Sequence, residues 1–150
     1  MTGKGEKAPE FALESDSAGT VRLSDFAGRT VVLYFYPRDD TPGCTTEACG
    51  FRDVFDSLVE KGAVVIGISP DTVASHARFR GKHSLQFILL ADTDRTVARL
   101  YGAWGTKNMY GRIVEGVVRS TFVIGPDGVV REVFPKVKPE GHAAEILAAL

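Results

Sequence analysis

The sequence predicts an α/β fold in which a central mixed β-sheet is flanked by helices. The first observation is a set of three short, almost wholly apolar runs at residues 30–36, 63–69 and 87–91. Runs of this kind are typical of strands that are buried on both faces of a sheet. The second is the helical periodicity that follows each run, which predicts parallel pairing between successive strands. The third is a hairpin signal near the C-terminus, which adds antiparallel strands.

The N-terminal segment predicts a β-hairpin. Two short stretches, 11–14 and 20–23, flank the turn-forming residues 15–19. Residues 24–28 then predict a single capped turn that ends on a glycine. The first buried strand, 30–36, follows this turn and is bounded by a proline.

A long helix is predicted from about residue 44 to residue 60. Its apolar side chains recur at helical spacing and form one face, which consists of Ala48, Phe51, Phe55 and Leu58. The pair Lys61-Gly62 ends the helix, and the second buried strand, 63–69, begins directly after it.

The middle of the chain repeats the same alternation of helix and strand. Asp71 or Thr72 caps a helix that runs through about Lys82. The side chains expected to face inward are Val73, Ala77 and Phe79. After the third buried strand, 87–91, a short helix capped by Asp92 or Thr93 is predicted to run to Tyr101, where Gly102 ends it.

The C-terminal third predicts a loop, a hairpin and a helix. Residues 103–117 show no clear period and are predicted to form a loop. Strands 120–124 and 129–134 flank Gly-Pro-Asp-Gly at 125–128, which is a strong hairpin signal. Residues 141–150 predict a closing helix with its apolar residues on one face.

Length and composition indicate one globular domain that spans residues 1–150, with 44% hydrophobic and 25% charged residues. The formal net charge of -1 gives no electrostatic case for binding nucleic acid or an anionic membrane. The polar N-terminal residues lack the apolar segment of a signal peptide. The longest apolar run, 31–36, is too short to span a bilayer. We therefore expect a cytoplasmic protein.

The two cysteines, Cys44 and Cys49, both lie in the stretch 37–52. In a reducing compartment, cysteines favour a catalytic, redox-sensing or metal-binding role over a structural disulfide. Cys44 is predicted to lie in the first helical turn, where unpaired N–H groups and the helix dipole stabilise a thiolate, the nucleophilic form. The alternative is that Cys44 is a small buried apolar residue. The turn signal Pro42-Gly43 favours the reactive position.

No metal or nucleotide site is predicted. The histidines His76, His83 and His142 are far apart in the sequence and do not have the spacing of metal ligands. The two cysteines lack the further ligands of a zinc site. The chain also contains no glycine-rich phosphate-binding loop. We therefore expect no cofactor.

The stretch around Cys44 resembles a known family. Pro37, Thr41 and Cys44 match the peroxiredoxin pattern Pro-x-x-x-Thr-x-x-Cys, and residues 36–49 are similar to its bacterioferritin-comigratory (PrxQ) subfamily. The resemblance extends over nearly the whole chain through Trp104, Lys107, residues 109–111 and residues 119–122. It implies a thioredoxin-like fold and thiol-dependent reduction of hydrogen peroxide and organic hydroperoxides. It also implies thioredoxin as the usual recycling reductant.

The resemblance assigns roles to both cysteines. Cys44 is the expected nucleophile, which becomes a sulfenic acid on attacking the peroxide. Cys49 is the expected resolving residue, which forms an intramolecular disulfide with Cys44. The Thr41 hydroxyl is expected to orient sulfur and peroxide, and Pro37 to shield the sulfur from water. A turn or cap residue at 41, a strand terminator at 37 and a buried helix-face cysteine at 49 are the alternatives.

Arg119 and Glu47 are expected to complete the site. The resemblance places Arg119 beside the thiolate, where it stabilises charge that develops on the leaving oxygen. Glu47 is expected to hold this arginine. The main-chain N–H groups of Gly43 and Cys44 are expected to add donors to the peroxide. The alternatives are a surface charge at 119 and a solvated helix face at 47.

Two other functions stay open at this point. A general disulfide oxidoreductase on the same fold is disfavoured because the chain lacks a Cys-x-x-Cys motif. A redox sensor or holdase, whose oxidation alters binding to a partner, is the third candidate. The sequence leaves open whether thioredoxin or glutaredoxin is the reductant. A monomer is expected, since the resolving cysteine lies in the same chain.

Overall fold

The computed structural model describes the backbone of residues 1–150 and every side chain except that of Met109. Its strands are β1 Ala12–Ser15, β2 Thr20–Arg22, β3 Thr30–Phe35, β4 Ala63–Ser69, β5 Ile88–Ala91, β6 Trp104–Met109, β7 Arg112–Val117, β8 Ser120–Ile124 and β9 Val130–Phe134. Its helices are α1 Pro42–Asp53, α2 Phe55–Glu60, α3 Val73–His83, α4 Thr96–Tyr101 and α5 His142–Ala149, with a 3-10 helix η1 at Leu23–Phe26.

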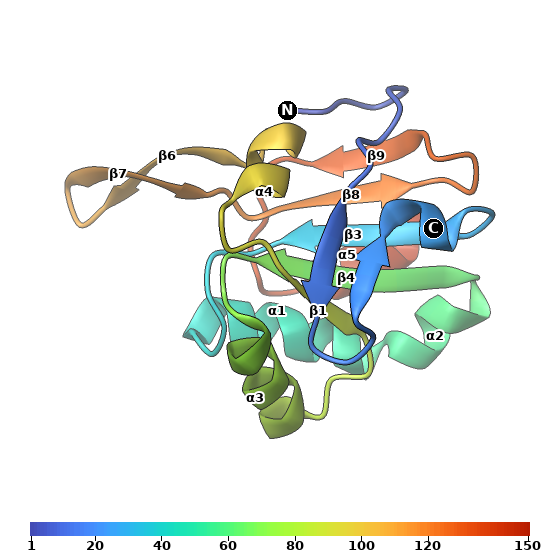
Figure 1. Cartoon of the computed structure of the whole chain (residues 1–150), viewed down its shortest axis with the longest axis horizontal. Helices are drawn as coiled ribbons and strands as arrows, with labels where there is room; N and C mark the ends of the chain where they lie inside the picture. The colour runs from blue at the N-terminus through green and yellow to red at the C-terminus, as the bar shows by residue number, and fades with distance from the viewer.

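Seven of the strands form one mixed sheet, in the order β2-β1-β5-β4-β3-β8-β9 (Figure 1). The central pairs β3–β4 and β4–β5 are parallel, and the other pairs are antiparallel. This confirms the predicted α/β fold with a mixed sheet, an N-terminal hairpin and a late hairpin. At the centre of the sheet, strand β3 lies beside strand β8, which follows it in the chain by about ninety positions.

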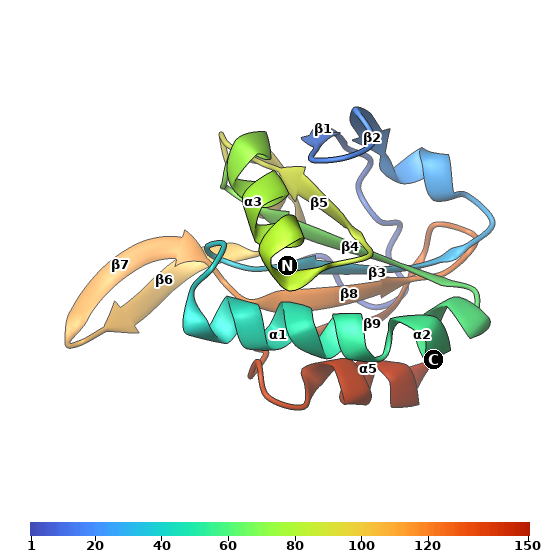
Figure 2. The same ribbon diagram turned by 90° about the horizontal axis from the view of Figure 1, so that it is seen from below.

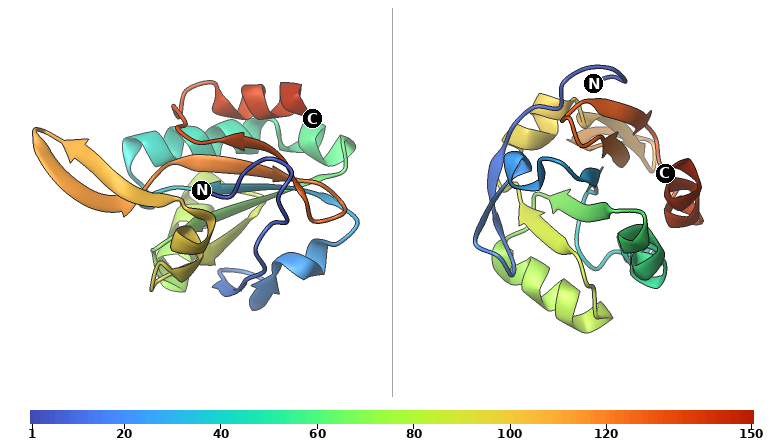
Figure 3. Two further views of the ribbon diagram at one scale, coloured as in Figure 1. Left: turned by 90° about the horizontal axis from the view of Figure 1, so that it is seen from above. Right: turned by 90° about the vertical axis from the view of Figure 1, so that its right-hand side faces the viewer.

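Helices cover both faces of the sheet. Helices α1, α2 and α5 lie together on one face, and α4 lies over the opposite face (Figures 2 and 3). Strand β3 is buried on both sides, because Val32 and Tyr34 pack into the cluster beneath α1 while Leu33 and Phe35 pack into the cluster beneath α4. Burial on both faces explains why this strand is apolar without alternation.

The prediction of one helix over 44–60 is wrong in two respects: the helix begins earlier than predicted, and it is interrupted, so that two helices form. Helix α1 begins at Pro42, because proline lacks an N–H and its fixed φ suits the first helical position. At Val54 the backbone leaves helical geometry (φ -107°, ψ 10°), and α2 begins at the next residue. The buried Leu58 keeps the apolar rhythm across this break, so periodicity alone does not reveal it.

The prediction of a loop over 103–117 is also wrong. Strands β6 and β7 pair in antiparallel fashion along six residue pairs. The turn consists of Tyr110 and Gly111, which both have positive φ (55° and 82°), as a two-residue hairpin turn requires. This hairpin projects from the body of the molecule (Figure 1). Few of its side chains are buried, so burial leaves no period in its sequence.

Two details of the smaller helices differ from expectation. Helix α3 buries His76 and Phe79, whereas Val73 and Ala77, which were expected to face inward, are exposed. Helix α4 begins at Thr96 rather than directly after Asp92. The Asp92 carboxylate nevertheless accepts hydrogen bonds from the amides of the second and third residues of α4.

No helix in the described chain combines the length and the apolar character that crossing a membrane requires.

Candidate active site

The first turn of α1 places Cys44 at the end of the central strand β3. The loop 37–41 leads from β3 to Thr41, which is extended (φ -87°, ψ 155°) and precedes the first helical residue Pro42. The first amide that bonds within the helix is that of Thr45, which donates to the Thr41 carbonyl at 2.8 Å. The amides of Gly43 and Cys44 therefore belong to the helix end that lacks intrahelical acceptors. This end carries the positive pole of the helix dipole.

Cys44 is buried, with 1% of its surface exposed, and its closest charged neighbour is Arg119. Nη2 of Arg119 lies 3.2 Å from the Cys44 sulfur, and Nη1 lies 2.7 Å from Oε1 of Glu47. Arg119 reaches this position because β8 pairs with β3 and places Ser120 opposite Phe35. The structure thus brings together Cys44, Arg119 and Glu47.

Glu47 is fully buried one helical turn after Cys44. Burial raises the pKa of its carboxyl to about 7, against the opposing effects of the Arg119 charge and hydrogen bond. Burial would lower the pKa of Arg119, but the charges of Cys44 and Glu47 outweigh it and raise that pKa. Since Glu47 accepts the Nη1 bond, it holds the guanidinium with its other nitrogen toward the sulfur.

Gly43 lets the guanidinium approach the helix end closely. A Cβ atom built on Gly43 lies only 3.3 Å from Nη2 of Arg119 and 3.3 Å from Cγ of Pro139. The loop that carries Pro139 also anchors the arginine backbone, because the Val137 amide donates to the Arg119 carbonyl at 3.0 Å. Neither loop residue was singled out from the sequence, since only their spatial contacts connect them to the site.

Thr41 and Pro37 lie at the rim of this site, and both are half-buried. The Thr41 hydroxyl donates to the Arg38 carbonyl at 2.9 Å, a bond that closes the loop before α1. The role of this hydroxyl in orienting sulfur and peroxide stays a prediction. Pro37 directly follows the last buried residue of the β3 run, Tyr36.

Cys49 lies on the same helix as Cys44 and is half-buried, and both thiols are free. Five residues on a continuous α-helix separate the two Cα atoms by about 8.6 Å. A disulfide requires a Cα separation of about 4.4–6.8 Å. The two sulfurs therefore cannot bond unless α1 opens.

Lys107 adds a second positive charge near the thiol. It lies on β6 and is half-buried. Burial and the like charge of Arg119 lower its pKa, while the Cys44 charge acts in the opposite direction. Its sequence neighbours show no period, so only the family resemblance drew attention to it.

A separate polar cluster joins the loop 37–41 to α3 and to the end of β4. The ligand-type atoms of Asp39, Asp71 and His76 all lie within 4.8 Å of one another. These atoms are engaged in protein hydrogen bonds, among them one of 2.7 Å between His76 Nδ1 and Asp39. The pairing of His76 with Asp39 was not predicted, because the sequence spacing of the histidines bears only on metal ligation.

The family model described as AhpC/TSA matches residues 4–133. A putative peroxiredoxin bcp from Coxiella burnetii is 50% identical over 146 residues, which cover 97% of this chain and 97% of that protein. The peroxiredoxin Bcp of Bacillus subtilis is 47% identical over 146 residues, covering 97% of this chain and 93% of the relative.

A solved structure of the Xanthomonas campestris bacterioferritin comigratory protein is similar throughout. It is 40% identical, covers 93% of this chain and 88% of its own, and superposes with a TM-score of 0.87. That protein was studied for its alkyl peroxide reduction activity in trapped intermediate and ligand complexes.

Proposed function

The chain belongs to the AhpC/TSA family and is a peroxiredoxin, a thiol-dependent peroxidase, and from this premise we propose that Cys44 is the residue that reacts with the hydroperoxide. The observation that carries this assignment is the 3.2 Å contact between Nη2 of Arg119 and the Cys44 sulfur. A half-buried guanidinium beside a thiol at a helix N-terminus favours the thiolate.

The first step is nucleophilic attack by the Cys44 thiolate on one peroxide oxygen. A sulfur–oxygen bond forms as the oxygen–oxygen bond breaks, so the sulfur is oxidised to a sulfenic acid. The departing oxygen leaves as hydroxide or alkoxide and takes up a proton to give water or an alcohol. Arg119 and the outward-facing amides of Gly43 and Cys44 supply donors for this developing negative charge.

The second step is attack by the Cys49 thiolate on the sulfur of the sulfenic acid. A Cys44–Cys49 disulfide forms and the hydroxyl departs as water after protonation. Since the helical separation is too long for this bond, the first turns of α1 open before it forms. An external dithiol then reduces the disulfide through a mixed disulfide.

The reductant that we propose is thioredoxin, with glutaredoxin as the alternative of the same chemistry. Hydrogen peroxide and organic hydroperoxides are the proposed substrates. The alkyl peroxide reduction of the Xanthomonas relative supports the organic class. We propose that the enzyme is a monomer, because both redox cysteines lie in one chain. We also propose that it consists of a single domain, acts in the cytoplasm and needs no cofactor.

A stopped-flow assay tests the assignment. Reduced protein is mixed with hydrogen peroxide or an alkyl hydroperoxide, and turnover is followed with thioredoxin or glutaredoxin as the electron donor. We expect rapid turnover with a hydroperoxide and little reduction of insulin, which a general disulfide oxidoreductase reduces. Slow peroxide consumption combined with no recycling by either donor would instead favour the redox-sensor function.

A further inference from the structure

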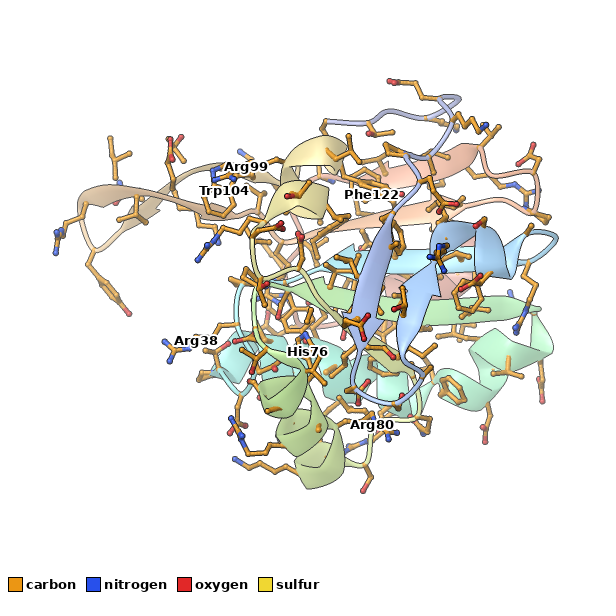
Figure 4. The ribbon with its side chains drawn as sticks, in the orientation of Figure 1. Arg38, His76, Arg80, Arg99, Trp104 and Phe122 are labelled. Atoms are coloured by element: carbon orange, nitrogen blue, oxygen red, sulfur yellow. The ribbon has the colours of Figure 1, made fainter. Side chains whose placement is uncertain are left out.

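A buried histidine forms a hydrogen bond to the loop that leads into the Cys44 turn. Asp39 lies in this loop, and its side chain is only 3% exposed. His76 on α3 is fully buried, and its Nδ1 lies 2.7 Å from Oδ2 of Asp39. Figure 4 shows His76 at the end of α3 that lies nearest the sheet.

Hydrogen bonding determines where the proton of this pair must lie. Nε2 of His76 lies 2.9 Å from the Leu90 carbonyl oxygen, which can only accept, so Nε2 carries a hydrogen. The other nitrogen faces a carboxylate oxygen at 2.7 Å, a contact that needs a second proton between the two atoms. Asp39 and His76 together therefore hold one more proton than a neutral imidazole and a free carboxylate.

Three titratable groups face the imidazole, each from a different element. Asp39 comes from the loop after β3, Tyr36 from the end of the β3 run, and Asp71 from the end of β4. The Tyr36 hydroxyl donates to Oδ1 of Asp39 at 2.6 Å, and the Asp39 amide donates to Asp71 at 2.7 Å. Strand β5 contributes only the Leu90 carbonyl.

These negative surroundings favour the protonated imidazole. Burial alone would lower the pKa of His76, but the hydrogen bond and charge of Asp39, the Leu90 carbonyl and Asp71 outweigh it and raise that pKa. The loop is also tied to α3 at the surface, where Lys82 and His83 contact the Asp40 carboxylate. A surface pocket of about 440 Å³ between the loop and α3 is lined by Asp39 and Asp40 among others, but not by His76.

We propose that His76 is a positioning residue for the reaction of Cys44: its protonated ring holds Asp39, and thereby the loop 37–41, so that loss of this proton releases the turn that carries the thiol. The expected effect of His76 on catalysis rests on the proposed roles of Cys44 and Cys49. The expected effect of His76 on the loop is independent of those roles, because it is measured on the reduced protein in the absence of peroxide.

The direction of the pH dependence follows from the proton balance. Opening moves Asp39 away from the ring, and the exposed imidazole returns to an ordinary pKa of about 6.5. Between that value and the raised pKa of the closed state, opening releases a proton. Rising pH therefore favours the open loop, by at most about tenfold for each pH unit. Below the ordinary value the hold on the loop is fully present.

Two measurements on the reduced protein test the proposal directly. The first is an NMR titration of the His76 ring, for which we expect a pKa above about 6.5. The second is amide hydrogen exchange of residues 38–45 from about pH 6 to about pH 9, corrected for the intrinsic exchange rate. Protection should fall with pH in the wild type and should be independent of pH, and lower throughout, in His76→Gln.

The matched control is Arg78→Gln, which changes an exposed side chain of the same helix and should retain the wild-type fall in protection. If His76→Gln does not fold, Asp39→Asn serves in its place and should move the His76 titration to lower pH. A His76 ring that titrates below about 6.5, or a His76→Gln protein that retains the wild-type pH dependence, overturns the proposal.

The link to catalysis is tested separately by resolving the two steps in time. The rate of sulfenic acid formation is measured in Cys49→Ser, and the rate of disulfide formation in the wild type, each with and without His76→Gln. In the wild type, the rate of disulfide formation should change with pH between about 6.5 and the raised pKa of His76, and His76→Gln should remove this change. If hydrogen exchange shows the expected loop opening but His76→Gln leaves disulfide formation unchanged, the catalytic role is refuted and the effect on the loop still holds.

Discussion

Nη2 of Arg119 lies 3.2 Å from the sulfur of Cys44, although 75 positions separate the two residues in the chain. The contact depends on the antiparallel pairing of β8 with β3, which brings the start of one strand to the end of the other. Glu47 then directs the guanidinium by accepting from its other terminal nitrogen at 2.7 Å. The surroundings of the thiol are thus formed jointly by a helix end and a neighbouring strand.

Replacing Arg119 by methionine tests this contact. Arg119→Met should slow peroxide attack on the order of tenfold or more, because a hydrogen bond to a charged group is worth about 1.5–3 kcal/mol. The rate of Cys44 alkylation at neutral pH should also fall. Arg112→Met, an exposed arginine on β7, is the control and should behave as wild type. An alkylation rate unchanged in Arg119→Met would count against a role of Arg119 in the reactivity of the thiol.

The two cysteines should have separable roles. Cys44→Ser should abolish peroxide reduction, because it removes the nucleophile. Cys49→Ser should consume about one peroxide per chain and then stall in the presence of thioredoxin, since sulfenic acid formation needs only one thiol. Single-turnover and steady-state peroxide assays distinguish the two outcomes. Full steady-state activity of Cys44→Ser would exclude Cys44 as the reacting residue.

Gly43 should matter through the space that it leaves for Arg119. A Cβ in Gly43→Ala meets Nη2 of Arg119 and Cγ of Pro139 at 3.3 Å each, so the guanidinium must shift. We expect peroxide attack to slow roughly several-fold while stability changes by less than about 1 kcal/mol. Stopped-flow kinetics and urea unfolding measure the two effects. The control Gly81→Ala has open space around its Cβ and should leave the rate unchanged.

The buried carboxyl of Glu47 should be visible in the pH dependence of stability. Its pKa is raised from 4.5 to about 7 in the folded protein, so the unfolded chain releases this proton at lower pH. The stabilising contribution is present below about 4.5 and is lost as pH rises to about 7. Glu47→Gln should remove that decline in urea-unfolding free energy. A decline of the wild-type size in Glu47→Gln would show that other groups cause it, and exposed Glu60→Gln is the control.

Oxidation should unwind the beginning of α1. The two cysteines are about 8.6 Å apart at Cα on a continuous helix, beyond the reach of a disulfide. We therefore expect amide protection over residues 43–52 to fall in the Cys44–Cys49 disulfide form relative to the reduced form. Hydrogen exchange in both redox states measures this change. Equal protection in the two states would refute the unwinding step.

The sheet was largely predictable from the sequence. Strands 63–69 and 120–124 have the predicted bounds, because burial on both faces leaves mostly apolar runs between turn signals. The β6–β7 hairpin was not predictable in this way, since a projecting hairpin buries few side chains. The break at Val54 was also missed, because one non-helical residue does not disturb the spacing of the buried side chains.

The candidate site was predictable only in part. Cys44 at a helix start follows from the local sequence, since a proline and a glycine directly precede it. The pairing of Arg119 with Cys44 depends on strand register, and only the family resemblance suggested it. The pairing of Asp39 with His76 depends on which face of α3 is buried, and the apolar pattern placed Val73 and Ala77 there instead.

The interruption at Val54 sets a limit on how far the redox cycle disturbs the molecule. Helix α2 begins after this break, and its buried Leu58 packs into the same cluster as β4 and the α1 residues Ala48 and Phe51. The helix that the proposed disulfide requires to open ends at Asp53, and each helical hydrogen bond that it loses costs about 0.5–1.5 kcal/mol. We therefore expect oxidation to cause a local order–disorder transition that stops at this break, with the sheet and α2 folded throughout.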